Sequence, residues 1–197
     1  MNDALNYYKD INRVISIHGY VYPLKARLPE TFFLKDTGCW GWATWKRGWK
    51  LFERDGSLLL NEIRERRLST DFDFQNSYPF TRMLEKQTRG LVGSWAIRWQ
   101  ASAFLHNKLT LYPGRSLVLP IGHDGTGTNN PSTRQYDVVL CDNPVKISAI
   151  LLAENKAVRE KYISYFRLIM SLKTRLFFYL KLLNIYIDGL RQKLLSK

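Results

Sequence analysis

The sequence predicts an α/β domain followed by a helical tail, and three observations carry this prediction. Short segments with alternating apolar residues indicate strands, at residues 13–19, 31–34 and 109–112. Longer charged segments with one apolar face indicate helices, at residues 58–67 and 78–89. After residue 155, apolar residues recur at steps of three and four in one continuous stripe. We therefore divide the chain into a domain at residues 1–155 and a basic amphipathic helical tail at residues 156–197.

The remaining elements follow from local signals. A polar start with two apolar residues on one face indicates a short helix at residues 2–10, and the prolines of residues 20–30 indicate a loop. Acids alternate with phenylalanines at residues 71–74, which favours an edge strand over a metal-binding pair of acids. Further strands are expected towards the end of the domain, at residues 116–119, 136–140 and 145–147.

Length and composition bound the class of protein. With 197 residues, of which 45% are apolar, the chain can bury one sizeable core and carry an appendage. Cys39 and Cys141 form neither a metal-binding spacing nor a disulfide framework, which fits a reducing cytoplasm. The start lacks an apolar signal region, and no segment reaches about 18 uncharged apolar residues. We expect a chain that does not span a membrane.

The net charge of +13 is concentrated in the tail, where ten Lys and Arg residues are opposed only by Glu160 and Asp188. A helix that is basic on one side and rich in Leu, Phe and Tyr on the other can lie on an anionic membrane surface. We expect this role, and keep a helix packed on the domain or on a partner subunit as the alternative. Nucleic-acid binding is disfavoured because no RNA-binding signature or zinc-finger spacing accompanies the charge.

Four of the six tryptophans lie within residues 38–49, and this density is unusual for a core. Flat aromatic rings next to glycines can form a platform on which the CH groups of a sugar stack. In the alternative, residues 42–49 form a short helix whose Trp42, Trp45 and Trp49 face the core. Both interpretations stay open from the sequence.

Three ordered motifs resemble one family. They are Trp-Gly-Trp-Ala-Thr-Trp at residues 40–45, Ser-Trp-Ala-Ile-Arg-Trp at residues 94–99, and the block at residues 109–128. Together they resemble the acceptor side of bacterial family-2 glycosyltransferases of the GT-A type. The resemblance covers roughly residues 1–155. The nucleotide-binding half of such enzymes, with its Asp-x-Asp-like cluster, has no counterpart here, so the resemblance implies a partial GT-A-like domain.

The resemblance implies a set of functional residues. Acceptor-binding residues would be Trp40, Gly41, Trp42, Trp45, Trp95, Arg98 and Trp99. A glycine-rich loop over the donor diphosphate would use Gly122, His123, Gly125 and Gly127. Arg98 shares a helical side with Trp95, so it can stack on that ring or bind an anion.

Two carboxylates are the candidate catalytic groups, because a transferase needs a base for the acceptor hydroxyl. Asp124 lies in the glycine-rich loop beside His123, and the pair could contact a metal or a phosphate. Asp36 directly precedes the tryptophan stretch, where the alternative is a turn-forming role. The chain departs from the family pattern at Gly93, where Asp or Asn is frequent, and also at Pro120 and Asn129, which are expected as Asn and His.

The resemblance implies transfer of a sugar from a nucleotide sugar to a glycan or lipid-linked acceptor in cell-surface polysaccharide synthesis. It also implies a cytoplasmic location, peripheral at the inner membrane face. The complete enzyme would use a divalent metal, Mn²⁺ or Mg²⁺, although this sequence offers no metal cluster of its own. The alternative is a non-catalytic remnant of the family that binds a glycan or a membrane.

Overall fold

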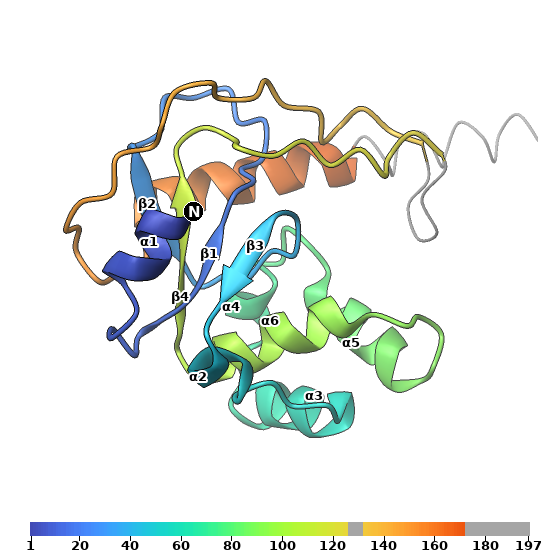
Figure 1. Ribbon diagram of the computed structural model, residues 1–197. Helices are drawn as coiled ribbons and strands as arrows, with labels where there is room; N and C mark the ends of the chain where they lie inside the picture. The colour runs from blue at the N-terminus through green and yellow to red at the C-terminus, as the bar shows by residue number, and fades with distance from the viewer. Residues whose placement is uncertain (126–131, 172–197) are drawn as a thin grey trace, which may run out of the picture.

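The computed structural model describes residues 1–125 and 132–171, and it shows an α/β fold (Figure 1). Within these residues, four strands form one mixed sheet in the order β2-β4-β1-β3. The strands are β1 Val14–His18, β2 Thr31–Leu34, β3 Trp42–Thr44 and β4 Leu109–Pro113. The helices are α1 Asn2–Tyr7, α2 Lys46–Trp49, α3 Gly56–Glu65, α4 Ser69–Phe72, α5 Phe80–Thr88 and α6 Trp95–Leu105, and a last helix includes residues 156–171. The predicted α/β class is confirmed.

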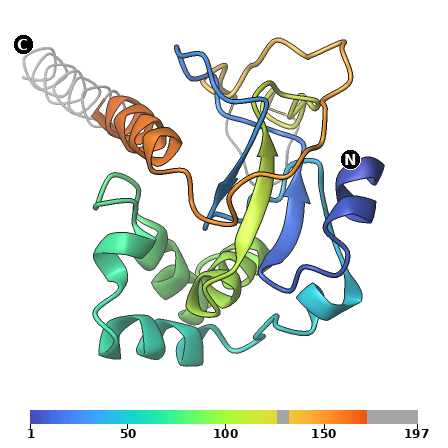
Figure 2. The ribbon, with the colours of Figure 1, turned by 90° about the vertical axis from the view of Figure 1, so that its left-hand side faces the viewer.

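The two central strands, β1 and β4, run parallel, and each has an antiparallel neighbour on its outer side. A parallel pair requires a long crossover, which here contains β2, β3 and the helices α2 to α6. Every residue of β1, β2 and β4 is buried, because both faces of the sheet are covered. Figure 2 shows α1 on one side of the sheet, the helix at residues 156–171 on the other, and α3 to α6 beneath.

Successive residues of β2 point into two different cores, as the pleat of a strand requires. Phe32 and Leu34 belong to the large core that α3, α5 and α6 share with the helix at residues 156–171. Phe33 belongs to a second core on the opposite face, where α1 packs through Ala4. The sheet therefore separates two hydrophobic layers, and its end lies against the α3 to α6 layer.

The edge strand expected at residues 71–74 is wrong. Residues 69–72 form α4, and both Phe72 and Phe74 are buried in the large core. Helical hydrogen bonds exclude the strand: the Phe72 N–H donates to the Leu68 carbonyl at 2.9 Å and the Asp73 N–H to the Ser69 carbonyl at 2.8 Å. The two acids have separate partners: Asp73 accepts hydrogen bonds from the backbone and hydroxyl of Thr81 at 2.7 and 2.9 Å, and Asp71 pairs with Arg159 at 2.7 Å.

The strands expected at residues 116–119, 136–140 and 145–147 are also wrong. These segments run irregularly over the domain and make isolated contacts in place of a ladder. Ser116, for example, accepts the Val21 N–H through its hydroxyl at 3.0 Å and the Cys141 N–H through its carbonyl at 2.8 Å. An extended segment that alternates between a packed and an exposed side has the same sequence pattern as a strand.

The first part of the predicted tail belongs to the core. Val158, Tyr162 and Phe166 are at most 1% exposed and pack among the residues of the large core. In residues 156–171, the apolar stripe is therefore covered by the domain, which agrees with the packed-helix alternative. Residues 172–197 lie outside the described residues, so membrane binding by that part stays a prediction. No helix in the described ranges is long and apolar enough to cross a membrane.

Candidate functional site

A cavity of about 540 Å³ lies where the end of the sheet meets α5 and the start of α6. Its wall contains aromatic rings, which include Tyr20, Tyr22, Trp40, Tyr78, Trp95, Tyr112 and Tyr136. Polar side chains are interspersed among them, and these include Asp36, Thr37, Lys86, Ser94 and Gln100. A mixture of flat apolar surfaces and hydrogen-bonding groups suits a ligand with CH faces and hydroxyl edges, as a sugar has.

The fold brings the first two sequence motifs together at this cavity. Trp40 stands in the loop before β3, and Trp95 is the first residue of α6, yet both rings line the cavity. The Ser94 side chain caps α6 by accepting the Ile97 N–H at 3.4 Å, which fixes the start of the helix. Gly41 has a φ of 59°, and a Cβ there would collide with Val118. The glycine allows the turn between Trp40 and β3.

Asp36 is the buried carboxyl group of the cavity wall, with 4% of its surface exposed. The Tyr112 hydroxyl donates a hydrogen bond to Asp36 Oδ2 at 2.9 Å, and the Gly38 N–H donates to the same hydroxyl at 3.2 Å. Burial raises the pKa of Asp36 from 3.8 to about 6, although the hydrogen bond from Tyr112 opposes that rise. A carboxyl group with a pKa close to neutral can accept and release a proton under cellular conditions.

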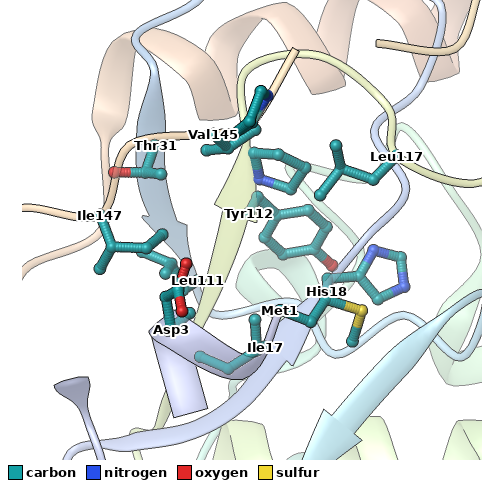
Figure 3. A pocket seen from close by; sticks show the side chains of 13 residues that line it. Met1, Asp3, Ile17, His18, Thr31, Leu111, Tyr112, Leu117, Val145 and Ile147 are labelled. Atoms are coloured by element: carbon teal, nitrogen blue, oxygen red, sulfur yellow. The ribbon is translucent and has the colours of Figure 1, made fainter. Parts of the chain in front are cut away.

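His18 and Tyr112 separate this cavity from a second, smaller one of about 260 Å³ (Figure 3). Their ring centroids are 4.8 Å apart. Burial lowers the pKa of His18 to about 4, so the ring is neutral at pH 7 and its Nδ1–H donates to the Tyr20 carbonyl at 2.7 Å. A Cβ on Gly38 would overlap His18 Nε2, so the glycine permits the loop carrying Asp36 to approach this ring.

The tryptophans of the two motifs form one cluster beside the cavity. Trp42, Trp49, Trp95 and Trp99 have ring centroids between 5.3 and 6.1 Å apart in their contacting pairs. Residues 42–49 are not one helix, since β3 and α2 divide them. Trp99 is fully buried and Trp45 packs against the core near α1, whereas Trp49 and Trp95 are 42% and 41% exposed. The cluster thus has a core ring and a solvent-facing side.

Arg98 does not stack on Trp95 in this structure. Its guanidinium Nη1 donates to the Arg54 carbonyl at 2.7 Å, and the group lies over Phe52 at 5.6 Å from the ring centroid. The contacts join α6 to the segment before α3. Arg98 therefore serves to connect two elements, and it is absent from the cavity wall.

Of the expected donor loop, His123 lies behind the cavity wall. His123 is 7% exposed, and its ring contacts Trp40 and Tyr136 at centroid distances of 5.2 and 4.8 Å. Gly122 is partly exposed, and Asp124 and Gly125 are exposed. Gly127 lies outside the described residues. His123 thus supports two rings of the cavity, while Asp36, and not Asp124, is the candidate acid in its wall.

Several lining residues carried no sequence signal. Tyr22 and Tyr78 stand in unremarkable segments, and Lys86 and Gln100 look like ordinary helix-surface residues. Gly93 also lines the cavity, at the position where the resembled family often has an acid or amide. In the described part of the chain, no group of three or more His, Cys, Asp or Glu side chains could hold a metal ion.

The chain matches no protein-family model, no curated protein and no solved structure in the comparisons made. The family likeness consequently rests on the three sequence motifs. The cavity supports a functional hypothesis independently of that likeness, because its residues and their contacts are observed in the structure of this chain.

Proposed function

We propose that the cavity binds the acceptor sugar of a glycosyl-transfer reaction and that Asp36 is the base for the attacking hydroxyl. The observation that supports this most is a buried carboxyl group, with a pKa of about 6, in the same wall as Trp40 and Trp95. The aromatic rings would contact the CH face of a pyranose, and the polar side chains would hydrogen-bond its hydroxyls.

In the proposed step, the acceptor oxygen forms its bond to the anomeric carbon of the donor sugar while the bond to the diphosphate breaks. Asp36 takes the hydroxyl proton as this happens, and the Tyr112 hydroxyl holds the carboxylate in position. The nucleotide sugar would be held by a nucleotide-binding half that the described residues do not include. A divalent metal would neutralise the diphosphate there, and because the described residues offer no fitting metal site, we assign no step to it.

A non-catalytic glycan-binding role is the second candidate, and Gly93 favours it. This residue gives the cavity wall no side chain where the resembled family often has an acid or amide. A site that has lost a catalytic group can keep its aromatic rings and still bind a sugar. The two candidates differ in the role of Asp36. A transferase needs its carboxylate for turnover, whereas a glycan-binding protein has no reaction for it to catalyse.

Calorimetry with methyl glycosides of glucose, galactose, N-acetylglucosamine and rhamnose tests the acceptor site. At least one glycoside should bind the full chain, and Trp40→Ala should weaken that binding about tenfold. Asp36→Asn should keep the affinity within about twofold and abolish transfer once a nucleotide-binding half is supplied. Transfer that survives in Asp36→Asn would refute the role of this residue, and absence of any glycoside binding would refute the acceptor site.

A second titration tests whether the donor site lies outside the described domain. The chain alone should bind UDP-glucose with Mn²⁺ weakly or not at all, because the donor site is assigned to another half. Tight binding would contradict the partial-domain interpretation.

We also propose attachment to the inner membrane face through residues 172–197, which carry six Lys and Arg against Asp188. Flotation with anionic liposomes should retain the full chain and should not retain a chain ending at residue 171. Retention on single-stranded DNA at matched salt, without flotation, would contradict this proposal.

A further inference from the structure

Exposed tryptophan rings lie beside the cavity and form a surface that extends beyond the cavity wall. We define the tryptophan patch as Trp42, Trp49 and Trp95, which come from β3, α2 and α6. Trp49 and Trp95 leave 42% and 41% of their surface exposed, while Trp99 fills the space beneath them. Trp99 is fully buried and Trp42 is half-buried, so burial in the core does not account for the neighbouring exposed rings of Trp49 and Trp95.

The patch is continuous with the cavity. Trp95 lines the cavity and also contacts Trp42 and Trp49, with ring centroids 5.7 and 6.1 Å apart. A ligand that leaves the cavity past Trp95 would therefore meet the other two rings next. Trp49 is itself held in place by Phe52, whose ring stacks on it at 4.7 Å with an interplanar angle of 10°.

The patch has both features that sugar binding uses. Its indole rings offer flat apolar surface, and the exposed Lys46 and Lys50 stand at either end of α2, the helix that carries Trp49, as hydrogen-bond donors. Within the cavity, the same combination of rings and polar groups recurs. The tryptophan patch thus offers the same kinds of contact as the cavity wall. Such repetition is expected of a surface that binds successive units of one oligosaccharide.

We propose that the tryptophan patch is a second sugar subsite, and that the acceptor is an oligosaccharide of at least two units. The terminal sugar lies in the cavity, and the preceding sugar lies against Trp49 and Trp95. This inference rests on the proposed function, and it adds the substrate class: an extended glycan in place of a single sugar or a small aglycone.

The test compares single sugars with short chains of sugars on the full-length protein. The probes are the four methyl glycosides named above and an array of their two- to six-unit oligosaccharides. Affinity should rise about tenfold or more from one unit to two or three, and then level off. Trp49→Ala should remove that rise without changing the affinity for single sugars, whereas Trp40→Ala should weaken both.

Two further variants separate lost stacking from lost folding. Trp49→Leu keeps an apolar contact with Phe52 and Trp99 but has no planar ring, and it should lose the length dependence as Trp49→Ala does. Tyr7→Ala removes an aromatic residue of α1 that is 47% exposed and whose ring contacts Tyr8, and it should bind as the wild type does. Thermal melting checks that each variant is folded.

The outcomes are distinguishable. Single-sugar binding without length dependence would overturn the second subsite and leave the cavity proposal standing. Length dependence that Trp49→Ala and Trp49→Leu leave intact would overturn it as well. The same variants are also tested on vesicles carrying polyprenyl phosphate. If Trp49→Ala loses binding to these vesicles while its oligosaccharide binding is unchanged, the patch binds a lipid and the sugar subsite is refuted. Absence of binding to every sugar probe would refute both proposals.

Discussion

Replacing Asp36 with asparagine tests the central electrostatic claim about the cavity. Burial raises the pKa of this carboxyl group from 3.8 to about 6, so the folded protein holds its proton more tightly than the unfolded chain does. Between about pH 4 and pH 6 the folded state binds a proton that the unfolded state has released. The free energy of unfolding must therefore be larger at low pH and fall as the pH rises through 6.

The size of this effect follows from the pKa. A rise from 3.8 to about 6 corresponds to about 3 kcal/mol of stability at pH values well below 3.8, of which about 2 kcal/mol is still present at pH 4 and is lost by pH 7. Asp36→Asn cannot ionise, so it removes this pH-dependent part and leaves the contributions of all other groups. The asparagine oxygen can still accept the hydrogen bond from the Tyr112 hydroxyl.

Urea unfolding of both proteins at pH 4, 5, 6 and 7 measures the effect. The difference in unfolding free energy between wild type and variant should change by about 2 kcal/mol across this range, with the wild type losing stability relative to the variant as the pH rises. Parallel curves would refute the reasoning, because they would mean that the Asp36 carboxyl is not desolvated in the folded protein.

Two further substitutions test the supports of the site. Gly38→Ala should lower stability by about 1–3 kcal/mol in denaturant unfolding, because its Cβ would overlap the buried His18 ring; Gly93→Ala, where a Cβ meets nothing within 4 Å, is the matched control and should change little. Arg159→Met should cost about 3 kcal/mol, because its guanidinium is 9% exposed and its loss removes the cation that pairs with the Asp71 and Glu154 carboxylates. Arg134→Met breaks an ion pair whose cation is 95% exposed and should shift the unfolding midpoint hardly at all. Equal effects of the two members in either pair would contradict the assigned contacts.

Local pattern was enough to predict most of the regular elements. The strands β1, β2 and β4 and the helices α3 and α5 lie within a few residues of the segments that periodicity indicates. Each of these elements has a single apolar side or a short continuous apolar run. The local sequence is therefore enough to indicate which of its residues are buried.

Sequence reasoning failed where burial depends on distant partners. Phe72 and Phe74 share one core because α5 and the helix at residues 156–171 close over them, and nothing in their own segment records this. The segment at residues 136–147 lies along the domain without a strand partner, although its alternation resembles that of a strand. Tertiary packing overrides local pattern in both cases.

The candidate site was predicted only in part, because its surroundings also depend on residues that are distant in the sequence. Asp36 is a candidate because it directly precedes the tryptophan stretch, Trp40 is one because it belongs to that stretch, and both line the cavity. The environment of Asp36 depends on Tyr112, which is 76 residues away in sequence, so its raised pKa could not be inferred beforehand. Trp99 has the same residue type as Trp95 and lies one helical turn away, yet its position toward the sheet makes it a core residue.

The most direct test of the account is a crystal structure of the full chain with the tightest-binding oligosaccharide from the array. The account requires a terminal sugar in the cavity beside Trp40, with one hydroxyl within hydrogen-bond distance of the Asp36 carboxylate. A sugar bound elsewhere, with the cavity unoccupied, would contradict the assignment of this cavity as the acceptor site.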